Sequence, residues 1–240
     1  MVTERKPLKR VLLKLSGEAL KGKHAFGVDY EYVGHLADEI LELTTTTNAE
    51  LGIVIGGGNY IRGGQQGDID RAVGDYMGML GTMINSMALQ AVFEAKGMQT
   101  RVVSALEIKE IAESYIRRRA IRHLEKKRIV IFACGTGNPF FTTDTAAALR
   151  GAEIGAEAIL KGTNVDGVYS DDPRKNPDAK LYHTITFSEA LERHLKVMDA
   201  TALALCRENN TPIIVFNMNK PGNIRKAIEG QIIGTYVGGE

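Results

Sequence analysis

The chain has 240 residues, which is long enough to bury one sizeable core, so we expect a single domain over residues 1–240. Apolar residues make up 44% of the chain and charged residues 25%, a composition typical of globular proteins rather than disordered ones. Positive and negative side chains nearly cancel, and the net charge of +1 argues against a nucleic-acid-binding surface.

Membrane and secretory signals are also missing from the sequence. No apolar run approaches the ~20 residues of a membrane span, and residues 1–7 lack the apolar core of a signal peptide. The two cysteines, Cys134 and Cys206, have no metal-like spacing. We therefore expect a cytoplasmic protein with reduced thiols, no metal held by protein side chains, and neither nucleic acid nor membrane as a partner.

The first predicted strand covers residues 9–15, and Lys14 interrupts its apolar run just before Ser16 and Gly17. Two interpretations of this lysine are open. Its side chain either reaches bulk water from the strand edge, or places an ammonium group at the carboxyl end of a strand, where open α/β sheets bind ligands. A helix is expected from Asp29, as N-cap, to about Leu43.

A second strand at residues 51–55 runs into Gly56, Gly57, Gly58 and Asn59. Successive glycines let a ligand approach the backbone, because no Cβ stands in the way. The spacing is not that of a dinucleotide-binding fingerprint, and no P-loop motif occurs in the chain. If this protein binds nucleotides, it does so without a P-loop.

Residues 71–96 carry a long helical pattern rich in Met, Ala and Gly, with Asp75 near its start. Its methionines recur at a spacing of four, which fits either adaptable core packing or contact with a second subunit. A third strand is expected at residues 101–104. The basic run over residues 116–128 is typical of a solvated helix face.

The segment GTGNPFFTTD, residues 135–144, lies between a predicted buried strand at 128–134 and a predicted helix at 145–153. A helix N-terminus offers free backbone N–H groups and a positive dipole end, which suit a phosphate. Taken alone, the segment also fits an ordinary strand-turn-helix connection.

Residues 157–160 predict a strand that ends at Lys161, and Asp166-Gly167 predicts a hairpin turn. Two helices are expected near residues 187–195 and 199–209. A last central strand is expected at 212–216, a helix starting at Pro221, and an edge strand at 234–238.

Alternating strands and helices predict an α/β fold, a three-layer αβα sandwich with a mainly parallel central sheet. Lys14, the glycines at 56–58, the segment 135–144 and residues 161–169 would then converge on one rim. Lysines and Gly-rich loops on one rim suit phosphoryl transfer, which requires positioning and positive charge. Asp144 would orient the two lysines or reach them through a metal ion.

The sequence resembles the bacterial-type UMP kinases of the amino acid kinase superfamily over about residues 8–237. The matching segments are KLSGEAL at 14–20, VIGGGN at 54–59 with Arg62, VGDYMGML at 73–80, GTGNPFFTTD at 135–144, TNVDGVY at 163–169, LKVMD at 195–199 and VFNMNKPG at 215–222.

The resemblance implies an amino acid kinase fold and specific site residues. The catalytic set would be Lys14, Lys161, Asp144 and Arg62, with Arg62 between the two phosphate groups. ATP would contact Lys14, Leu15, Ser16, Gly17, Gly58, Arg62, Thr163, Asn164, Tyr169 and Asp172. UMP would contact Gly57, Asp75 (through ribose hydroxyls), Thr136, Gly137, Asn138, Pro139, Phe140, Phe141, Thr142 and Thr143. Mg²⁺ would accompany ATP, held largely by phosphate oxygens and waters.

The resemblance further implies transfer of the γ-phosphoryl group of ATP to UMP in pyrimidine nucleotide synthesis, by a cytoplasmic homohexamer regulated by GTP activation and UTP inhibition. Arg101 and Arg128 fit the family's basic effector positions, whereas Gln90 and Glu94 replace basic or His side chains and argue against GTP activation. Asp199 lies in a shared motif, but the sequence gives it no role. The alternatives are a carbamate, acetylglutamate or aspartate kinase, or a uridine-nucleotide sensor without turnover.

Overall fold

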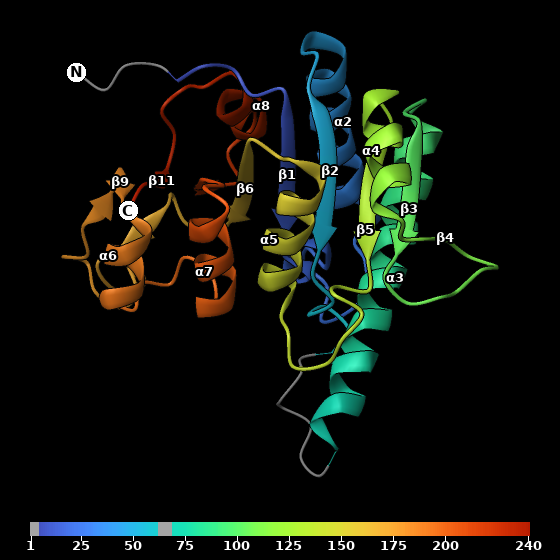
Figure 1. Ribbon diagram of the computed structural model, residues 1–240, viewed down its shortest axis with the longest axis horizontal. Helices are drawn as coiled ribbons and strands as arrows, with labels where there is room; N and C mark the ends of the chain where they lie inside the picture. The colour runs from blue at the N-terminus through green and yellow to red at the C-terminus, as the bar shows by residue number, and fades with distance from the viewer. Residues whose placement is uncertain (1–4, 62–68) are drawn as a thin grey trace.

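The computed structural model describes residues 5–61 and 69–240 (Figure 1). The strands are β1 (Arg10–Leu15), β2 (Glu50–Ile55), β3 (Thr100–Ser104), β4 (Glu113–Ser114), β5 (Ile129–Ala133), β6 (Ala158–Thr163), β7 (Val168–Tyr169), β8 (Leu181–Tyr182), β9 (Thr184–Ile185), β10 (Ile213–Asn217) and β11 (Thr235–Val237). The helices are α1 (Gly17–Leu20), α2 (Tyr30–Thr46), α3 (Arg71–Ala95), α4 (Arg117–Glu125), α5 (Thr143–Ile154), α6 (Phe187–Glu192), α7 (Ala200–Glu208) and α8 (Asn223–Ile228).

The main sheet has the strand order β4-β3-β5-β2-β1-β6-β10-β11-β9. Every pairing from β4 to β10 is parallel, and the pairing of β10 with β11 is antiparallel. From β1 the chain builds the sheet first toward β2 and later toward β6, so the direction of growth reverses at β1. In open α/β sheets, ligands bind outside the carboxyl ends of strands at such a reversal.

Helices cover both faces of this sheet. The buried side chains of α1, α2, α3 and α8 form one core cluster with the sheet, and those of α4, α5, α6 and α7 form a second cluster on the opposite face. Figure 1 shows α5 and α7 in front of the sheet and α2 behind it. The three-layer αβα sandwich with a mainly parallel sheet, predicted from the alternation of elements, is confirmed.

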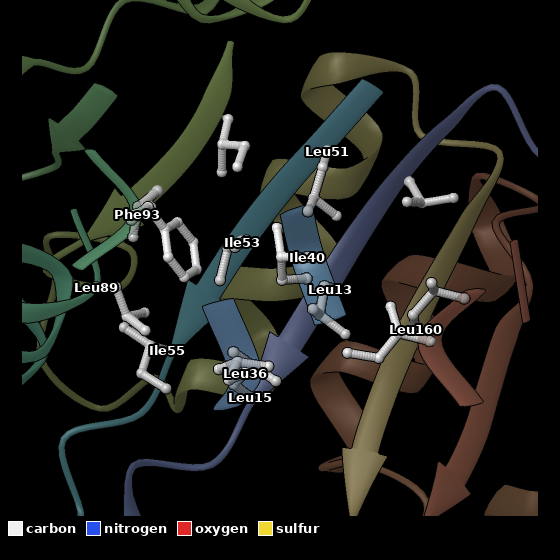
Figure 2. Packing of buried hydrophobic residues seen from close by; sticks show 14 of the residues in the cluster. Leu13, Leu15, Leu36, Ile40, Leu51, Ile53, Ile55, Leu89, Phe93 and Leu160 are labelled. Atoms are coloured by element: carbon white, nitrogen blue, oxygen red, sulfur yellow. The ribbon is translucent and has the colours of Figure 1, made fainter. Parts of the chain in front are cut away.

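Side-chain alternation along β1 decides which face Lys14 occupies. Leu13 and Leu15 pack with Leu36 and Ile40 of α2 in the first cluster (Figure 2). Leu12 packs on the opposite face, in the second cluster. Since residues of a strand point alternately to its two faces, Lys14 lies on the same face as Leu12, the face covered by α5.

Several local predictions were wrong at the carboxyl-terminal end of the chain. Asp166-Gly167 does not join a hairpin, because β7 pairs with β8 and not with β6. The backbone at Gly167 instead packs tightly against β11, because a Cβ on Gly167 would lie 2.5 Å from Thr235 Oγ1. Strand β11 is not an edge either, since β9 pairs with it. The last helix begins after Gly222, whose φ of 78° turns the chain, and not at Pro221.

Both cysteines are free and buried. Burial, together with the nearby carboxylates of Asp199 and Asp144, raises the pKa of the Cys206 thiol to about 12, so this thiol stays neutral near pH 7. Among the residues that the structure describes, no helix is both long enough and apolar enough to cross a membrane.

Candidate active site

The centre of the candidate site is a carboxylate held between two lysines. Lys14 of β1 and Lys161 of β6 are register partners on adjacent parallel strands, so their side chains leave the same face of the sheet. Asp144, in the first turn of α5, meets both. Its Oδ1 lies 2.8 Å from Lys14 Nζ, and its Oδ2 lies 2.8 Å from Lys161 Nζ.

These three side chains are largely withdrawn from solvent, with 12%, 17% and 14% of the side chain exposed for Lys14, Asp144 and Lys161. Lys14 therefore does not reach bulk water from the strand edge, which removes that interpretation. Two ammonium groups against one carboxylate leave an excess positive charge at the carboxyl ends of β1 and β6. That charge suits the oxygens of a phosphate chain.

The pKa values of the site reflect burial and mutual attraction. Burial alone would raise the pKa of Asp144, but the Lys14 and Lys161 ammonium groups outweigh it and hold the pKa below its ordinary value. Burial lowers the pKa of Lys161, and the Asp144 carboxylate only partly offsets that effect. The carboxylate is thus kept ionised and is held as an orienting group between the two ammonium groups.

The loop between α6 and α7 completes the support of this centre. The backbone oxygen of Val197 accepts a hydrogen bond from Lys161 Nζ. Asp199 caps α7 by accepting from the Ala202 N–H at 2.8 Å, and it also accepts from the hydroxyls of Thr142 and Thr145. Asp199 therefore ties the start of α5, which carries Asp144, to the start of α7. Sequence reasoning gave Asp199 no role, because this tie spans more than fifty residues of chain.

The Gly-rich loop after β2 packs against α1 on one side and α3 on the other. A Cβ on Gly17 would lie 2.3 Å from Gly56 O, and a Cβ on Gly57 would lie 2.4 Å from Gly78 O. Both glycines are therefore required for the packing of the protein itself. Gly58 differs, because its Cβ would meet only an ordinary contact, 3.6 Å from Glu18 Oε1.

A cavity of about 110 Å³ opens beside this loop. It is lined by Gly57, Asp75 and most of the predicted UMP contacts: Thr136, Asn138, Phe141, Thr142 and Thr143. Gly137, Pro139 and Phe140 belong to the same segment but do not line the cavity. Phe140 is 61% exposed, and its backbone N–H donates to Asp75 Oδ2 at 2.7 Å. Asp75 therefore holds the segment in place in addition to facing the cavity.

The backbone of this segment departs from ordinary geometry. Cys134 and Phe140 have φ values of 61° and 71°, a region that residues other than glycine rarely occupy. Gly135 and Gly137 have φ values of 57° and 83°. The chain therefore turns sharply between β5 and α5, and Thr142 is the N-cap of α5, where its hydroxyl accepts from the Asp144 N–H at 3.0 Å.

A second cavity, of about 330 Å³, lies between the chain that follows β6 and the chain that follows α6. It contains Tyr169 and Asp172, as predicted for the adenosine site, together with Arg193, His194 and Lys196, which sequence reasoning missed. Thr163 and Asn164 do not line it. The Thr163 hydroxyl donates to Val165 O at 2.7 Å, and Asn164 Oδ1 accepts from Asn219 at 3.4 Å.

The remaining predicted site residues lie at the end of β1 and at the start of α1, apart from Arg62. Lys14 and Leu15 are the last residues of β1, Ser16 is the N-cap of α1 without a side-chain capping bond, and Gly17 opens that helix. Arg62 lies outside the described residues. In the part of the chain that the structure describes, no group of three or more His, Cys, Asp or Glu side chains is placed to hold a metal ion.

Comparison with known proteins identifies the family to which this architecture belongs. Residues 9–217 match the Amino acid kinase family, a stretch that contains every predicted site residue. The chain belongs to the amino acid kinase family. Among the members of this family, the chain is 55% identical over 243 residues to the chloroplastic uridylate kinase PUMPKIN of Arabidopsis thaliana, covering 99% of this chain and 71% of that protein.

Solved structures of UMP kinases and of a uridylate kinase superpose on this chain over nearly its whole length. The UMP kinase of Bacillus anthracis superposes with a TM-score of 0.93 at 40% identity, covering 97% of both chains. The UMP kinase of Ureaplasma parvum gives a TM-score of 0.90 at 40% identity, covering 98% of this chain and all of that one (100%). The uridylate kinase of Archaeoglobus fulgidus is more distant, with a TM-score of 0.72 at 26% identity over 95% of this chain and 99% of that one.

Proposed function

We propose that this protein is a UMP kinase, a phosphotransferase that moves the γ-phosphoryl group of ATP to UMP and yields UDP and ADP. The observation that carries the proposal is the pair of lysines, largely withdrawn from solvent, that Asp144 holds at the carboxyl ends of β1 and β6. Relatives that match the chain over nearly its whole length are named uridylate kinase or UMP kinase.

The chemistry requires few groups from the protein. An oxygen of the UMP phosphate attacks the γ-phosphorus of ATP, and the bond from that phosphorus to the bridging oxygen breaks as ADP leaves with its electron pair. The attacking oxygen is already ionised near pH 7, since the second pKa of a phosphate monoester is about 6. A general base is therefore unnecessary, which fits an Asp144 carboxylate committed to two lysines.

Lys14 and Lys161 are proposed to stabilise the charge on the transferred phosphoryl group and on the oxygens of the leaving ADP. Their Cα atoms are paired in the sheet, which fixes the spacing of the two ammonium groups. Leu15, Ser16, Gly17 and Gly58 would supply backbone contacts to the same phosphates. Glycine at position 58 is then explained by a ligand that approaches the backbone, because the protein alone does not require it.

The two cavities would hold the two nucleosides. The smaller one, with Asp75 and the segment 136–143, is proposed for UMP. The larger one, with Tyr169 and Asp172, is proposed for the adenosine of ATP, with Thr163 and Asn164 contributing from its border. Arg62 is proposed to act between the two phosphate groups.

Mg²⁺ is proposed to enter with ATP. The described residues offer no cluster of carboxylates for it, and the carboxylate of Asp144 is taken by two lysines. Phosphate oxygens and waters would therefore supply most of its ligands, and the ion would neutralise phosphate charge.

A second copy of the chain is proposed to cover the outer face of α3, within a homohexamer built from dimers. Along this helix five large apolar side chains are each between 43% and 51% exposed: Val73, Tyr76, Leu80, Ile84 and Met87. Such a stripe is typical of a helix that packs against a partner. Light scattering that shows only a species near 26.2 kDa at micromolar concentration would contradict this part of the proposal.

Regulation by GTP is proposed to be weak. Glu94 Oε1 accepts from Gln90 Nε2 at 3.1 Å and lies 3.8 Å from Arg101 NH1, so Arg101 is partly neutralised at the position expected to be basic. Inhibition by UTP, a role in pyrimidine nucleotide synthesis and a cytoplasmic location stay predictions.

A coupled assay of ADP release with a panel of acceptors tests the proposed function. UMP is expected to be the fastest acceptor. Faster turnover of CMP, carbamate, acetylglutamate or aspartate would contradict the proposal, and UMP binding without ADP release would indicate a sensor.

A further inference from the structure

Two buried asparagines link the Gly-rich loop to the middle of α3. Asn59 Nδ2 donates to Asn85 Oδ1 at 2.9 Å, and Asn85 Nδ2 donates to Asn59 Oδ1 at 2.7 Å. Asn59 is 3% exposed and Asn85 is fully buried at 0%. This reciprocal pair lies outside the lysine centre and lines neither of the cavities described above.

Each amide also makes a second bond that fixes a loop carbonyl. Asn85 Nδ2 donates to Gly56 O at 2.7 Å, and Asn59 Nδ2 donates to Gly27 O at 2.7 Å. Each amide nitrogen carries two N–H donors, so both donors of both asparagines are used. A fully satisfied buried network of this kind has one arrangement, because turning either amide over would break all three of its hydrogen bonds.

The bond to Gly56 O determines the direction of the next N–H. The carbonyl of Gly56 and the N–H of Gly57 belong to one planar trans peptide unit and point in opposite directions. Because Asn85 holds the carbonyl on the α3 side, the Gly57 N–H points away from Asn85. Within the described part of the chain, neither the Gly57 N–H nor the Gly58 N–H donates to an acceptor. Gly57 also lines the smaller cavity.

The loop and the helix are in close backbone contact. The backbone of the loop touches α3 at its glycines, where a Cβ on Gly81 would lie 3.2 Å from Gly57 O. The same helix holds the second loop, since Thr82 Oγ1 accepts from the Cys134 N–H at 2.8 Å. Helix α3 thus fixes both loops of the site through buried side chains on one face.

We infer that Asn85 is a positioning residue for phosphoryl transfer: it fixes the peptide unit between Gly56 and Gly57 and so aims the Gly57 N–H at the transferred phosphoryl group. The inference rests on the proposed function, which places the ATP phosphates beside Gly58 and UMP in the cavity that Gly57 lines. A fixed donor at that point helps most when charge shifts in the transition state, whereas each nucleoside keeps its own contacts elsewhere.

Replacing Asn85 by alanine tests the inference through the division of the effect between kcat and KM. Asn85→Ala is expected to lower kcat on the order of 10²-fold, the effect of a misplacement of about 1 Å. The KM values for ATP and UMP are expected to change little. A purely structural role would lower the melting temperature but leave kcat per folded enzyme unchanged.

Ser86 supplies the matched control. It is the next residue of α3, it is equally buried, and its hydroxyl donates only to Thr82 O within the helix. Ser86→Ala is expected to keep the wild-type kcat. If Asn85→Ala does not fold, Asn85→Ser is measured instead, since serine is smaller than asparagine, neutral and able to admit a water.

The outcomes separate this inference from the proposed function. A wild-type enzyme without UMP-dependent ADP release contradicts the proposed function. A wild-type enzyme that is active, together with a folded Asn85 variant whose kcat stays within about threefold of wild type, contradicts the inference alone. An equal loss of kcat in Ser86→Ala also contradicts it, because the effect would then belong to the helix and not to the amide.

Discussion

The two halves of the site are built by different means. On the side proposed for ATP, the donor side, charged side chains from β1 and β6 meet a carboxylate at the start of α5, and direct ion pairs of 2.8 Å hold them. On the side proposed for UMP, the acceptor side, a loop with left-handed residues at Cys134 and Phe140 presents backbone groups and hydroxyls to a small cavity.

This difference shows what each substrate group requires. A transferred phosphoryl group needs charge at a fixed point, which paired strands supply because their Cα positions are set by the sheet. A nucleoside needs a cavity of matching shape with several polar contacts. A loop supplies such a cavity only if other parts of the protein hold the loop in place. Asp75 and Thr82 of α3 provide that support by binding the N–H groups of Phe140 and Cys134.

The largest effect is expected from a substitution that removes a positive charge from the donor side. Lys14→Ala is expected to lower kcat by about 10²–10³-fold and to raise the KM values much less, as for the loss of one preorganised group. Lys14→Arg should rescue poorly, since a planar guanidinium cannot replace a compact ammonium against Asp144. Steady-state kinetics on folded enzyme measures both. The control is Lys9→Ala, an exposed lysine just before the other end of β1, which should leave kcat unchanged.

A substitution on the acceptor side should affect binding more than turnover. Asp75→Asn is expected to cost roughly 1.5–3 kcal/mol in UMP affinity, or about 10–150-fold, because a charge-assisted bond to a ribose hydroxyl is lost and the bond from Phe140 is weakened. The ATP affinity should change less. Asp70→Asn is the control, since asparagine caps a helix as well as aspartate does. Equal losses for both nucleotides would contradict an acceptor-side position for Asp75.

The dependence of stability on pH tests whether Asp144 is a charged partner of the two lysines. The folded pKa of Asp144 lies below its ordinary value, so its pairing stabilises the protein above pH ~4 and is lost as the pH falls below that value. Wild type should therefore exceed Asp144→Asn in melting temperature near pH 7, and the difference should shrink toward pH ~3. A difference that stays constant with pH would show that Asp144 is not a charged partner in the folded protein.

The smallest effect is expected from an alanine substitution at Gly58, which is compared with the same substitution at the adjacent Gly57. Gly58→Ala should leave the melting temperature unchanged but raise the KM for ATP about tenfold, or about 1.4 kcal/mol, because only the ligand approaches this position. Gly57→Ala should instead destabilise the fold, since its Cβ would lie 2.4 Å from Gly78 O. The same response from both variants would contradict the assignment of Gly58 to the donor phosphates.

The centre formed by Lys14, Lys161 and Asp144 could be predicted from the sequence because its signals are local. Apolar runs predicted strands that end near Lys14 and Lys161, a parallel sheet brings the carboxyl ends of these strands together, and a Thr-Thr-Asp sequence marked the start of α5. The strand order at the other end of the sheet could not be predicted, because strands such as β7, β8 and β9 have only two residues each and carry no pattern.

The hydrogen bonds that hold the loops of the site could not be predicted from the sequence, for a different reason. Asn59 and Asn85 lie 26 residues apart, and Thr142 and Asp199 lie 57 residues apart, so no spacing in the sequence connects them. Arg193, His194 and Lys196 likewise reach the larger cavity from a loop whose position depends on the whole sheet. Each of these contacts is set by tertiary packing, which single-sequence patterns do not encode.

Titration of UMP into folded Lys14→Ala, with kcat measured on the same sample, tests the division between the two halves most directly. The predicted result is a UMP dissociation constant within about threefold of wild type beside a kcat that has fallen by at least about 10²-fold. A UMP affinity that falls as far as kcat, or a kcat close to that of wild type, would contradict the account.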